Sequence, residues 1–368
     1  MKKMFDLNLQ LFADAGTVTN YTGGTVNSYT GVQTTSSAMT PTMKTFYDTE
    51  LLENTRAKLI FVNLGKRQTL PRNHGRVVEW RKFNTLPKAD KLKEGVIPDG
   101  ATLGMTSVNV EIAQFGKYFT VSDRLEMEAV DDVILGGTEE LSASCSESMD
   151  LLTRNVLSAG TAVTFADVYN GSSFVSTPTT RAALLTALGT TGNVANVTAD
   201  MINKVVTALK KAKAPYYAGN KYLAIIHPSC TYDLRNDPYW VEAHKYSQTT
   251  EIFNGEIGEL HGVRFIESPN APVIKGTGAT KAVYQTIFLG RDAFSVVDPE
   301  GAGLEMIIKG KGEIGGPLEQ FSTVGCKFET AAKILYPERM MILESGSSYS
   351  STDTDNMAAI DHDYTAST

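Results

Sequence analysis

The sequence lacks the features that define several large classes of protein. Its 368 residues include only three cysteines, Cys145, Cys230 and Cys326, which lie far apart and form no CxxC pair. This spacing argues against a disulfide scaffold and a standard zinc finger, and it favours a reducing, intracellular origin. No apolar run approaches the ~18 residues of a membrane-spanning helix, and polar residues between Asp6 and Gln10 interrupt the stretch that resembles a signal peptide. We therefore expect neither a membrane protein nor export by that route.

An overall excess of positive charge is also absent. The chain has 34 lysines and arginines against 41 acidic residues, which gives a net charge of -7. Binding to nucleic acid through a generally basic surface is therefore not expected, and any such contact must be local. The composition, 42% hydrophobic and 20% charged, supplies enough apolar material for a core, and the length fits about two domains.

Little in the sequence supports catalysis. The motifs GxSxG, HExxH and the P-loop do not occur. The run IIKGKGEIGG (residues 307–316) matches GxGxxG, but Pro317 follows where a dinucleotide site needs a helix, so a glycine-rich turn is the better interpretation. His227 and Cys230 are metal-ligand types but form a single close pair. We therefore expect no catalytic, cofactor-binding or metal-binding residues, and an α/β enzyme that uses these groups is the less favoured alternative.

The first third of the chain predicts an arm, a helix and a projecting finger. Residues 13–43 contain no lysine or arginine and are rich in Thr, Ser, Gly and Asn, which predicts an extended arm or a mobile terminus. Helical spacing begins at Thr40–Pro41 and ends near residue 65. Residues 75–83 and 106–123 alternate with period two, so they are predicted strands that flank a broken connection and form a long finger.

A long amphipathic helix is predicted after the finger. From Thr138 onward, residues on one helical face recur until Gly160 ends the pattern. The glycines at 136–137 are expected to interrupt the chain before this helix, and Asp123 with Glu126 fits a capping box upstream of them.

The second half of the chain predicts a mixed α/β unit. Thr198 is a predicted N-cap for a helix with Met201, Val205 and Leu209 facing inward. Short apolar runs then alternate with turn-rich or helical pieces, and the chain returns to strands near its end. From Glu344 onward the sequence has five acids and no lysine or arginine, which predicts a polar tail.

Charge is strongly segregated along the chain. Residues 56–93 hold eleven basic residues and two acids, a net charge of +9, whereas residues 123–150 hold nine acids and one arginine, a net charge of -8. We hypothesise that the finger of one copy lies across the acidic helix of the next, a heterologous contact that closes rings or propagates. The alternative is that both segments are solvated or paired within one subunit, where surface pairs contribute little. The predicted contact joins Arg76, Arg81, Lys82, Lys88, Lys91 and Lys93 to Glu126, Glu128, Asp131, Asp132, Glu139 and Glu140.

The order of these parts resembles the major capsid proteins of tailed bacteriophages with the Hong Kong-type fold. Local segments that are similar to successive landmarks of this family include NLQLFAD, KLKEGVIPDG, QFGKYFTVSDR, IIHPSCTYDLRNDPYW and GGPLEQFSTVGCKFETAAKIL. The resemblance spans about residues 40–345 and implies an α+β fold. It implies an N-terminal arm (1–43), a peripheral domain with a long spine helix (44–75, 122–160 and 321–345), an extended two-stranded E-loop (76–121), an axial α/β domain (161–320) and an acidic tail (346–368).

The resemblance also implies a structural function rather than an enzymatic one. Copies of the chain would form hexamers and pentamers of an icosahedral shell around double-stranded DNA, assembled in the bacterial host cytoplasm and present in the virion. Implied partners are a separate scaffolding protein, a portal and DNA held by nonspecific contact, with no membrane and no cofactor. No covalent crosslink between E-loop lysines and asparagines is expected. An encapsulin-like compartment shell is the alternative within the same fold.

Overall fold

The computed structural model divides the chain into two units, Met1–Asn54 and Thr55–Thr368. In the first unit, β1 (Thr17–Thr19), β2 (Thr25–Asn27) and β3 (Gln33–Thr34) pair as a small antiparallel meander, a local pairing that the polar composition did not indicate. The described residues are 17–19, 25–27, 33–34, 59–73, 75–89, 91, 94–95, 100–128, 133–244, 256–275, 281–300, 303–310, 320–350 and 353–357. Most of the helix predicted from Thr40 lies outside them, and only α1 (Phe61–Leu64) is described.

A mixed seven-stranded sheet organises one part of the second unit. Its order is β13-β14-β12-β16-β20-β8, and β15 pairs with β16. β12 runs parallel to β14 and β20 runs parallel to β8, whereas the other neighbours are antiparallel. The strands are β8 (Val163–Phe165), β12 (Tyr222–Ile226), β13 (Glu256–Leu260), β14 (Val263–Glu267), β15 (Val273–Ile274), β16 (Val283–Leu289) and β20 (Met340–Ser345).

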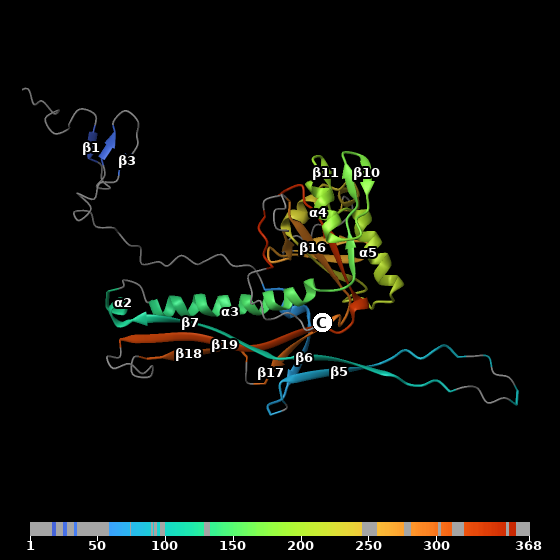
Figure 1. Cartoon of the computed structure of the whole chain (residues 1–368), viewed down its shortest axis with the longest axis horizontal. Coiled ribbons are helices and arrows are strands. Elements are labelled where there is room, and N and C mark those ends of the chain that lie inside the picture. The colour runs from blue at the N-terminus through green and yellow to red at the C-terminus, as the bar shows by residue number, and fades with distance from the viewer. Residues whose placement is uncertain are drawn as a thin grey trace, which may run out of the picture. The chain divides into compact units, whose positions relative to one another are not determined.

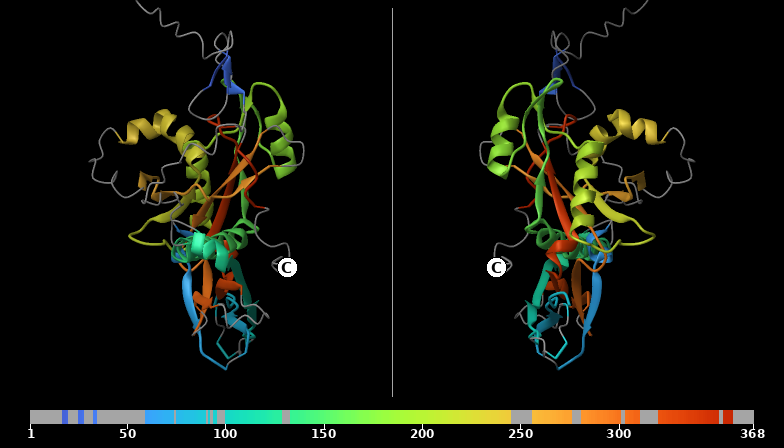
Figure 2. Two further views of the ribbon diagram at one scale, coloured as in Figure 1. Left: turned by 90° about the vertical axis from the view of Figure 1, so that its left-hand side faces the viewer. Right: turned by 90° about the vertical axis from the view of Figure 1, so that its right-hand side faces the viewer.

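Both faces of this sheet are covered, so every residue of β12 is buried. Tyr222 and Ala224 face a core shared with α5 (Ala199–Lys211), whereas Leu223 and Ile225 face a second core shared with α1 and the end of α3 (Val133–Ser158). Figure 2 shows α5 and α4 (Arg181–Gly189) on opposite sides of these strands. α6 (Pro228–Asn236) and α7 (Pro238–His244) follow β12, and β9 (Val168–Asn170), β10 (Ser173–Ser176) and β11 (Asn193–Val194) form a separate small sheet beside α4.

A five-stranded sheet lies along α3 in the other part of the unit (Figure 1). β19 is its longest strand and pairs over ten residues with β7, and α3 packs on this pair through Leu141, Leu152, Val324 and Phe328. The strands are β4 (Lys66–Leu70), β7 (Ala113–Ser122), β17 (Phe294–Pro299), β18 (Glu305–Lys309) and β19 (Phe321–Ile334).

The long helix was predicted with its start in the wrong place. α3 begins at Val133 and passes through Gly136 and Gly137 without interruption. A Cβ at Gly137 would collide with the ring of Phe119 on β7, so this glycine permits close approach of helix and sheet. The expected capping box is also absent, because Ser122 Oγ rather than Asp123 accepts the amide hydrogen of Leu125 at the start of α2 (Asp123–Glu128).

The predicted finger is present as a separate two-stranded ladder. β5 (Val77–Phe83) pairs with β6 (Met105–Glu111), from Val77 opposite Glu111 to Phe83 opposite Met105. The ladder extends away from α3 and the five-stranded sheet (Figure 1). Residues 106–123, predicted as one strand, divide at Ile112 because β6 pairs within the finger and β7 pairs with β19.

Sequence order and spatial order differ towards the end of the chain. β17 and β18 lie in the five-stranded sheet, whereas β20 lies inside the seven-stranded sheet. The segment after β20, predicted as a tail, is anchored where it is described. Asp353 accepts hydrogen bonds from Ser229 and Tyr284, and Asn356 bonds the backbone of Val273 in both directions. These pairings are long-range, so local pattern could not assign them.

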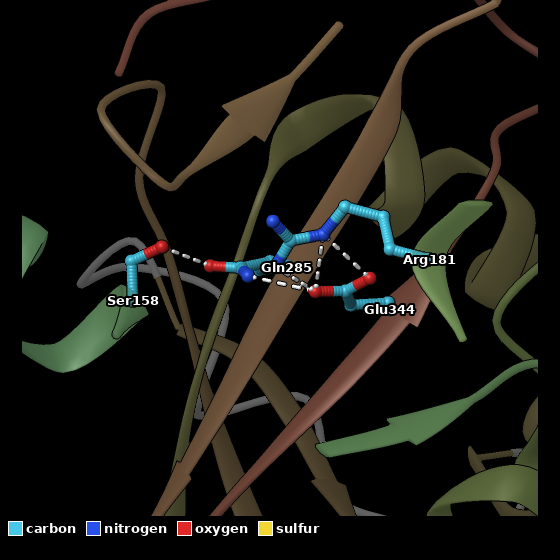
Figure 3. A network of polar contacts seen from close by, with 4 residues as sticks. All are labelled: Ser158, Arg181, Gln285 and Glu344. Carbon is cyan, nitrogen blue, oxygen red and sulfur yellow. Dashed lines mark hydrogen bonds and ion pairs between the residues drawn. The ribbon is translucent and has the colours of Figure 1, made fainter. Parts of the chain in front are cut away.

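A buried polar network joins the end of α3 to the seven-stranded sheet (Figure 3). Ser158 Oγ lies 2.5 Å from Gln285 Oε1, and Gln285 Nε2 donates to Glu344 Oε1 at 2.9 Å. Arg181, from the start of α4, pairs with the fully buried Glu344 carboxylate at 2.5 Å. This hydrogen bond raises the pKa of Arg181 against the opposing effect of its partial burial. The network fixes α3, α4, β16 and β20 relative to one another.

Candidate assembly surfaces

The base of the finger is fixed to its own subunit. Alternate residues of β5 and β6, Val78, Trp80 and Val110, face a small core with Val297 of β17 and Ala331 of β19. The opposite face of the ladder is exposed, as the alternating burial of β5 shows. The finger therefore leaves the sheet in a defined direction and keeps its outer face exposed.

Lys82, one of the residues predicted to reach a neighbour, is held within its own chain. Its Nζ lies 2.7 Å from Glu338 Oε1 and 4.7 Å from the centre of the Tyr336 ring, on which Arg339 also stacks. The hydrogen bond from Lys82 is the main reason that the pKa of Glu338 lies below its usual value. Lys82 therefore braces the finger base.

The remaining basic residues of the finger separate into paired and free groups. Arg76 pairs with Glu111 at 2.8 Å and Arg81 with Glu79 at 3.4 Å, both inside the finger. Lys88 is exposed beyond β5, as is Lys91, and neither has an ion-pair partner among the described residues. Lys93 lies outside the described residues. Of the six predicted basic residues, Lys88 and Lys91 are thus the ones that the described structure leaves available.

The acidic segment is also divided between surface and interior. Glu139 and Glu140 are exposed on α3. Glu128 is also exposed and pairs with Arg124 at 2.8 Å. Glu126 lies on α2 in an exposed position, and Asp131 and Asp132 lie outside the described residues. The structure describes one chain, so it leaves the predicted contact between copies as a proposal.

Asp150, counted with the acidic helix in the sequence, is fully buried. Its carboxylate accepts the amide hydrogens of Ile60 at 3.2 Å and Val62 at 2.9 Å, and burial raises its pKa despite these bonds. One turn further, Arg154 donates to the carbonyl oxygens of Asn270 and Asn356, and burial lowers its pKa to about 10. This part of α3 therefore binds segments near both ends of the second unit. A count of charges along the sequence cannot predict these contacts.

Exposed apolar side chains gather on the finger and on the open face of the five-stranded sheet. Phe83 and Met105, directly opposite in the ladder, are 61% and 53% exposed. On the sheet face away from α3, Tyr118 is 72% exposed beside a groove of about 400 Å³ that the backbone of Gly116 and Gly325 helps to line. Apolar area of this kind is typical of protein–protein interfaces.

The residues that the sequence offered for catalysis or ligand binding have structural roles in the fold. His227 caps α6, where its Nδ1 accepts the amide hydrogen of Ser229, and burial lowers its pKa. Cys230 is fully buried. Gly310 directly follows β18, and residues 311–316 of the glycine run lie outside the described residues. In the part of the chain that the structure describes, no group of three or more His, Cys, Asp or Glu could hold a metal. Within the same residues, no helix has the length and apolar character needed to cross a membrane.

The chain is similar to a known protein family and to many solved structures. A family model described as phage capsid protein matches residues 105–321. Among solved structures, the capsid of cyanophage P-SCSP1u has a TM-score of 0.61 at 14% identity and covers 86% of this chain and 96% of that one. The capsid of Helicobacter pylori bacteriophage KHP30 has a TM-score of 0.63 at 11% identity, with 83% and 96% covered. The capsid of Ralstonia phage GP4 has a TM-score of 0.58 at 16% identity, with 88% and 100% covered. No curated protein matches the sequence.

Proposed function

The chain belongs to the phage capsid protein family, and we propose that its copies form the hexamers and pentamers of an icosahedral shell around the double-stranded DNA of a tailed phage. The α+β Hong Kong-type fold predicted from the sequence is confirmed by the family match and the capsid structures. The chain is a major capsid protein, and its work is structural. A virion location follows from that function.

The observation that best supports self-assembly is the finger. The two-stranded ladder exposes an apolar pair, Phe83 and Met105, and the lysines beyond it, Lys88 and Lys91, have no ion-pair partner among the residues that the structure describes. Ordinary interfaces of ~1,600 Å², repeated around each subunit, stabilise a closed shell even when single contacts are weak. The finger is the element best placed to make such a contact with a neighbouring copy.

We assign the electrostatic part of this contact to Lys88 and Lys91 of one copy and to Glu139 and Glu140 on α3 of the next. Arg76, Arg81 and Lys82 serve the finger and its base, so they are secondary in this proposal. Complementary charge of this kind sets register and partner choice more than affinity.

A charge-swap experiment tests the contact. The double variant Lys88→Glu, Lys91→Glu should remain a folded subunit but lose large assemblies in analytical ultracentrifugation, and adding Glu139→Lys with Glu140→Lys should restore them. Lys210→Glu with Lys211→Glu, on exposed positions of α5, is the matched control for a change of charge alone. Normal assembly of the finger variant would refute the assignment.

Further partners are part of the same proposal. They are a separate scaffolding protein, a portal and the packaged DNA. Contact with DNA would be nonspecific, because the chain has a net charge of -7 and no basic recognition element. Assembly would take place in the host cytoplasm.

A further inference from the structure

A covalent bond joins α3 to the five-stranded sheet. Cys145 on α3 and Cys326 on β19 form a disulfide, with Cα atoms 6.9 Å apart and 181 residues between them in the sequence. Both side chains are about 3% exposed and lie in the core that holds the helix against β7 and β19. The wide spacing of the cysteines led us to expect no disulfide scaffold. The single bond found here does not build such a scaffold, because it links a helix and a strand that already pack together.

The first half of α3 is mostly half-buried. Between Val133 and Ser148, a stretch described throughout, Leu141 and Cys145 are the only fully buried residues. The same stretch contains two glycines and several serines, and Ser146 and Ser148 bond the backbone carbonyls four residues earlier. Such residues are weak helix formers, so this half of α3 depends on its contacts with the sheet. A bond at Cys145 acts at one of the two buried residues that anchor this stretch.

The surroundings of the three cysteines differ. Cys145 and Cys326 are paired with each other in one core. Cys230 is fully buried in the other core, where burial raises the pKa of its thiol to about 12. Cys230 is the one free cysteine of the three, so it remains a thiol when the other two form a bond.

We propose that Cys145 and Cys326 form a redox-operated clamp, open as two thiols in a reducing cell interior and closed as a disulfide in an oxidising medium. The timing rests on the proposed function, because a shell built inside a host and then released passes from the first condition to the second. Closure fixes the first half of α3 on the sheet. The clamp thus strengthens the subunit after assembly, when its shape is already set.

The oxidant is a low-molecular-weight disulfide. One cysteine thiolate attacks it and forms a mixed disulfide, which releases the first small thiol. The second cysteine thiolate attacks the protein sulfur of that mixed disulfide, which forms the Cys145–Cys326 bond and releases the second small thiol. Two protein thiols are oxidised and one small disulfide is reduced to two thiols, which take up the protons. The buried sulfurs become accessible when the first half of α3 lifts from the sheet.

Counting thiols on the full chain tests the clamp. Protein purified under reductant should show three thiols after denaturation, and incubation of the native protein with oxidised glutathione followed by removal of the reagent should leave one, Cys230. Cys145→Ser and Cys326→Ser should each prevent intramolecular bond formation, whereas Cys230→Ser should leave it unchanged. Three thiols after incubation with the oxidant, in a chain that remains folded, would overturn the proposal.

Hydrogen exchange separates a clamp from an inert bond. Closure should slow amide exchange in residues 133–148 by about tenfold or more, while residues of β12 and β16 stay unchanged. Equal exchange in the reduced and oxidised chain would contradict the functional part of the inference. Because both readouts work on isolated subunits, failure of assembly leaves them interpretable, and failure of the clamp leaves the capsid function untouched.

Discussion

The seven-stranded sheet and the finger with its five-stranded sheet show two different ways of using apolar residues. Every residue of β12 and β16 is buried, and helices cover both faces of their sheet. The finger and the open face beside β7 instead expose large apolar side chains such as Phe83 and Tyr118. The first region also exposes apolar side chains, such as Phe174 on β10 and Tyr239 on α7, but they lie off its large sheet, whereas one face of the five-stranded sheet and of the finger is open. We propose that a neighbouring copy covers this open face.

The largest expected loss of stability comes from breaking the buried polar network of the first region. Glu344→Ala removes the partner of Arg181 and of Gln285 Nε2, so the free energy of unfolding should fall by about 3 kcal/mol. Chemical denaturation of the full chain measures this loss. Glu338→Ala, at the exposed pair with Lys82, is the control and should cost about 1 kcal/mol or less. Equal losses at the two sites would remove the distinction between the two regions.

A smaller effect is expected inside the second region, at the finger base. Trp80→Ala should lower stability by about 2 kcal/mol, because the half-buried ring packs with Val110, Val297 and Ala331. Trp80→Phe keeps most of this packing and removes the indole Nε1, a buried donor without a partner among the described residues. Its stability should therefore stay within about 1 kcal/mol of the unchanged protein. A loss as large as that of Trp80→Ala would contradict this account of the base, and thermal unfolding measures both variants.

The smallest effect concerns pH and the anchored segment after β20. Burial acts to raise the pKa of Asp353, but hydrogen bonds from Tyr284, Ser350 and Ser229 together hold it below its usual value. The ionised carboxylate is thus favoured in the folded state. Its contribution of about 1 kcal/mol or less is present above pH ~4 and is lost as the pH falls through the lowered pKa.

Limited proteolysis at pH 7 and pH 3 measures this prediction. Residues 346–357 should be released sooner at pH 3, while β12 and β16 stay protected at both values. Asp353→Asn should remove most of the difference between the two pH values. If the variant kept the full pH dependence, another group would have to be responsible for it.

Much of the architecture could be predicted because it depends on local periodicity. The alternation of residues 75–83 predicted the ladder of β5, and the stripe that begins at Leu141 predicted most of α3. The cap at Thr198 is confirmed by its bond to the amide of Met201. Each of these signals lies within a few residues of the structure that it specifies.

The features that were missed depend on partners far along the chain. In the sequence, Gly137 predicted a helix interruption. In the structure it lies inside α3 and makes room for the ring of Phe119, which comes from β7. Lys82 was counted with a basic stretch, but in the structure it pairs with Glu338. Asp150 was counted with an acidic stretch, but in the structure it is buried and accepts hydrogen bonds from the amides of Ile60 and Val62. The charge pattern alone therefore did not show which charged residues are already held within their own chain, and the contact between copies stays a prediction.

The measurement that tests the central claim most directly is negative-stain electron microscopy of the purified chain, expressed alone and together with a candidate scaffolding protein. Self-assembly predicts round, uniform shells or six-fold rings, and it predicts their loss in the Lys88→Glu, Lys91→Glu variant. Small discrete particles of the unchanged chain under every condition would contradict the account.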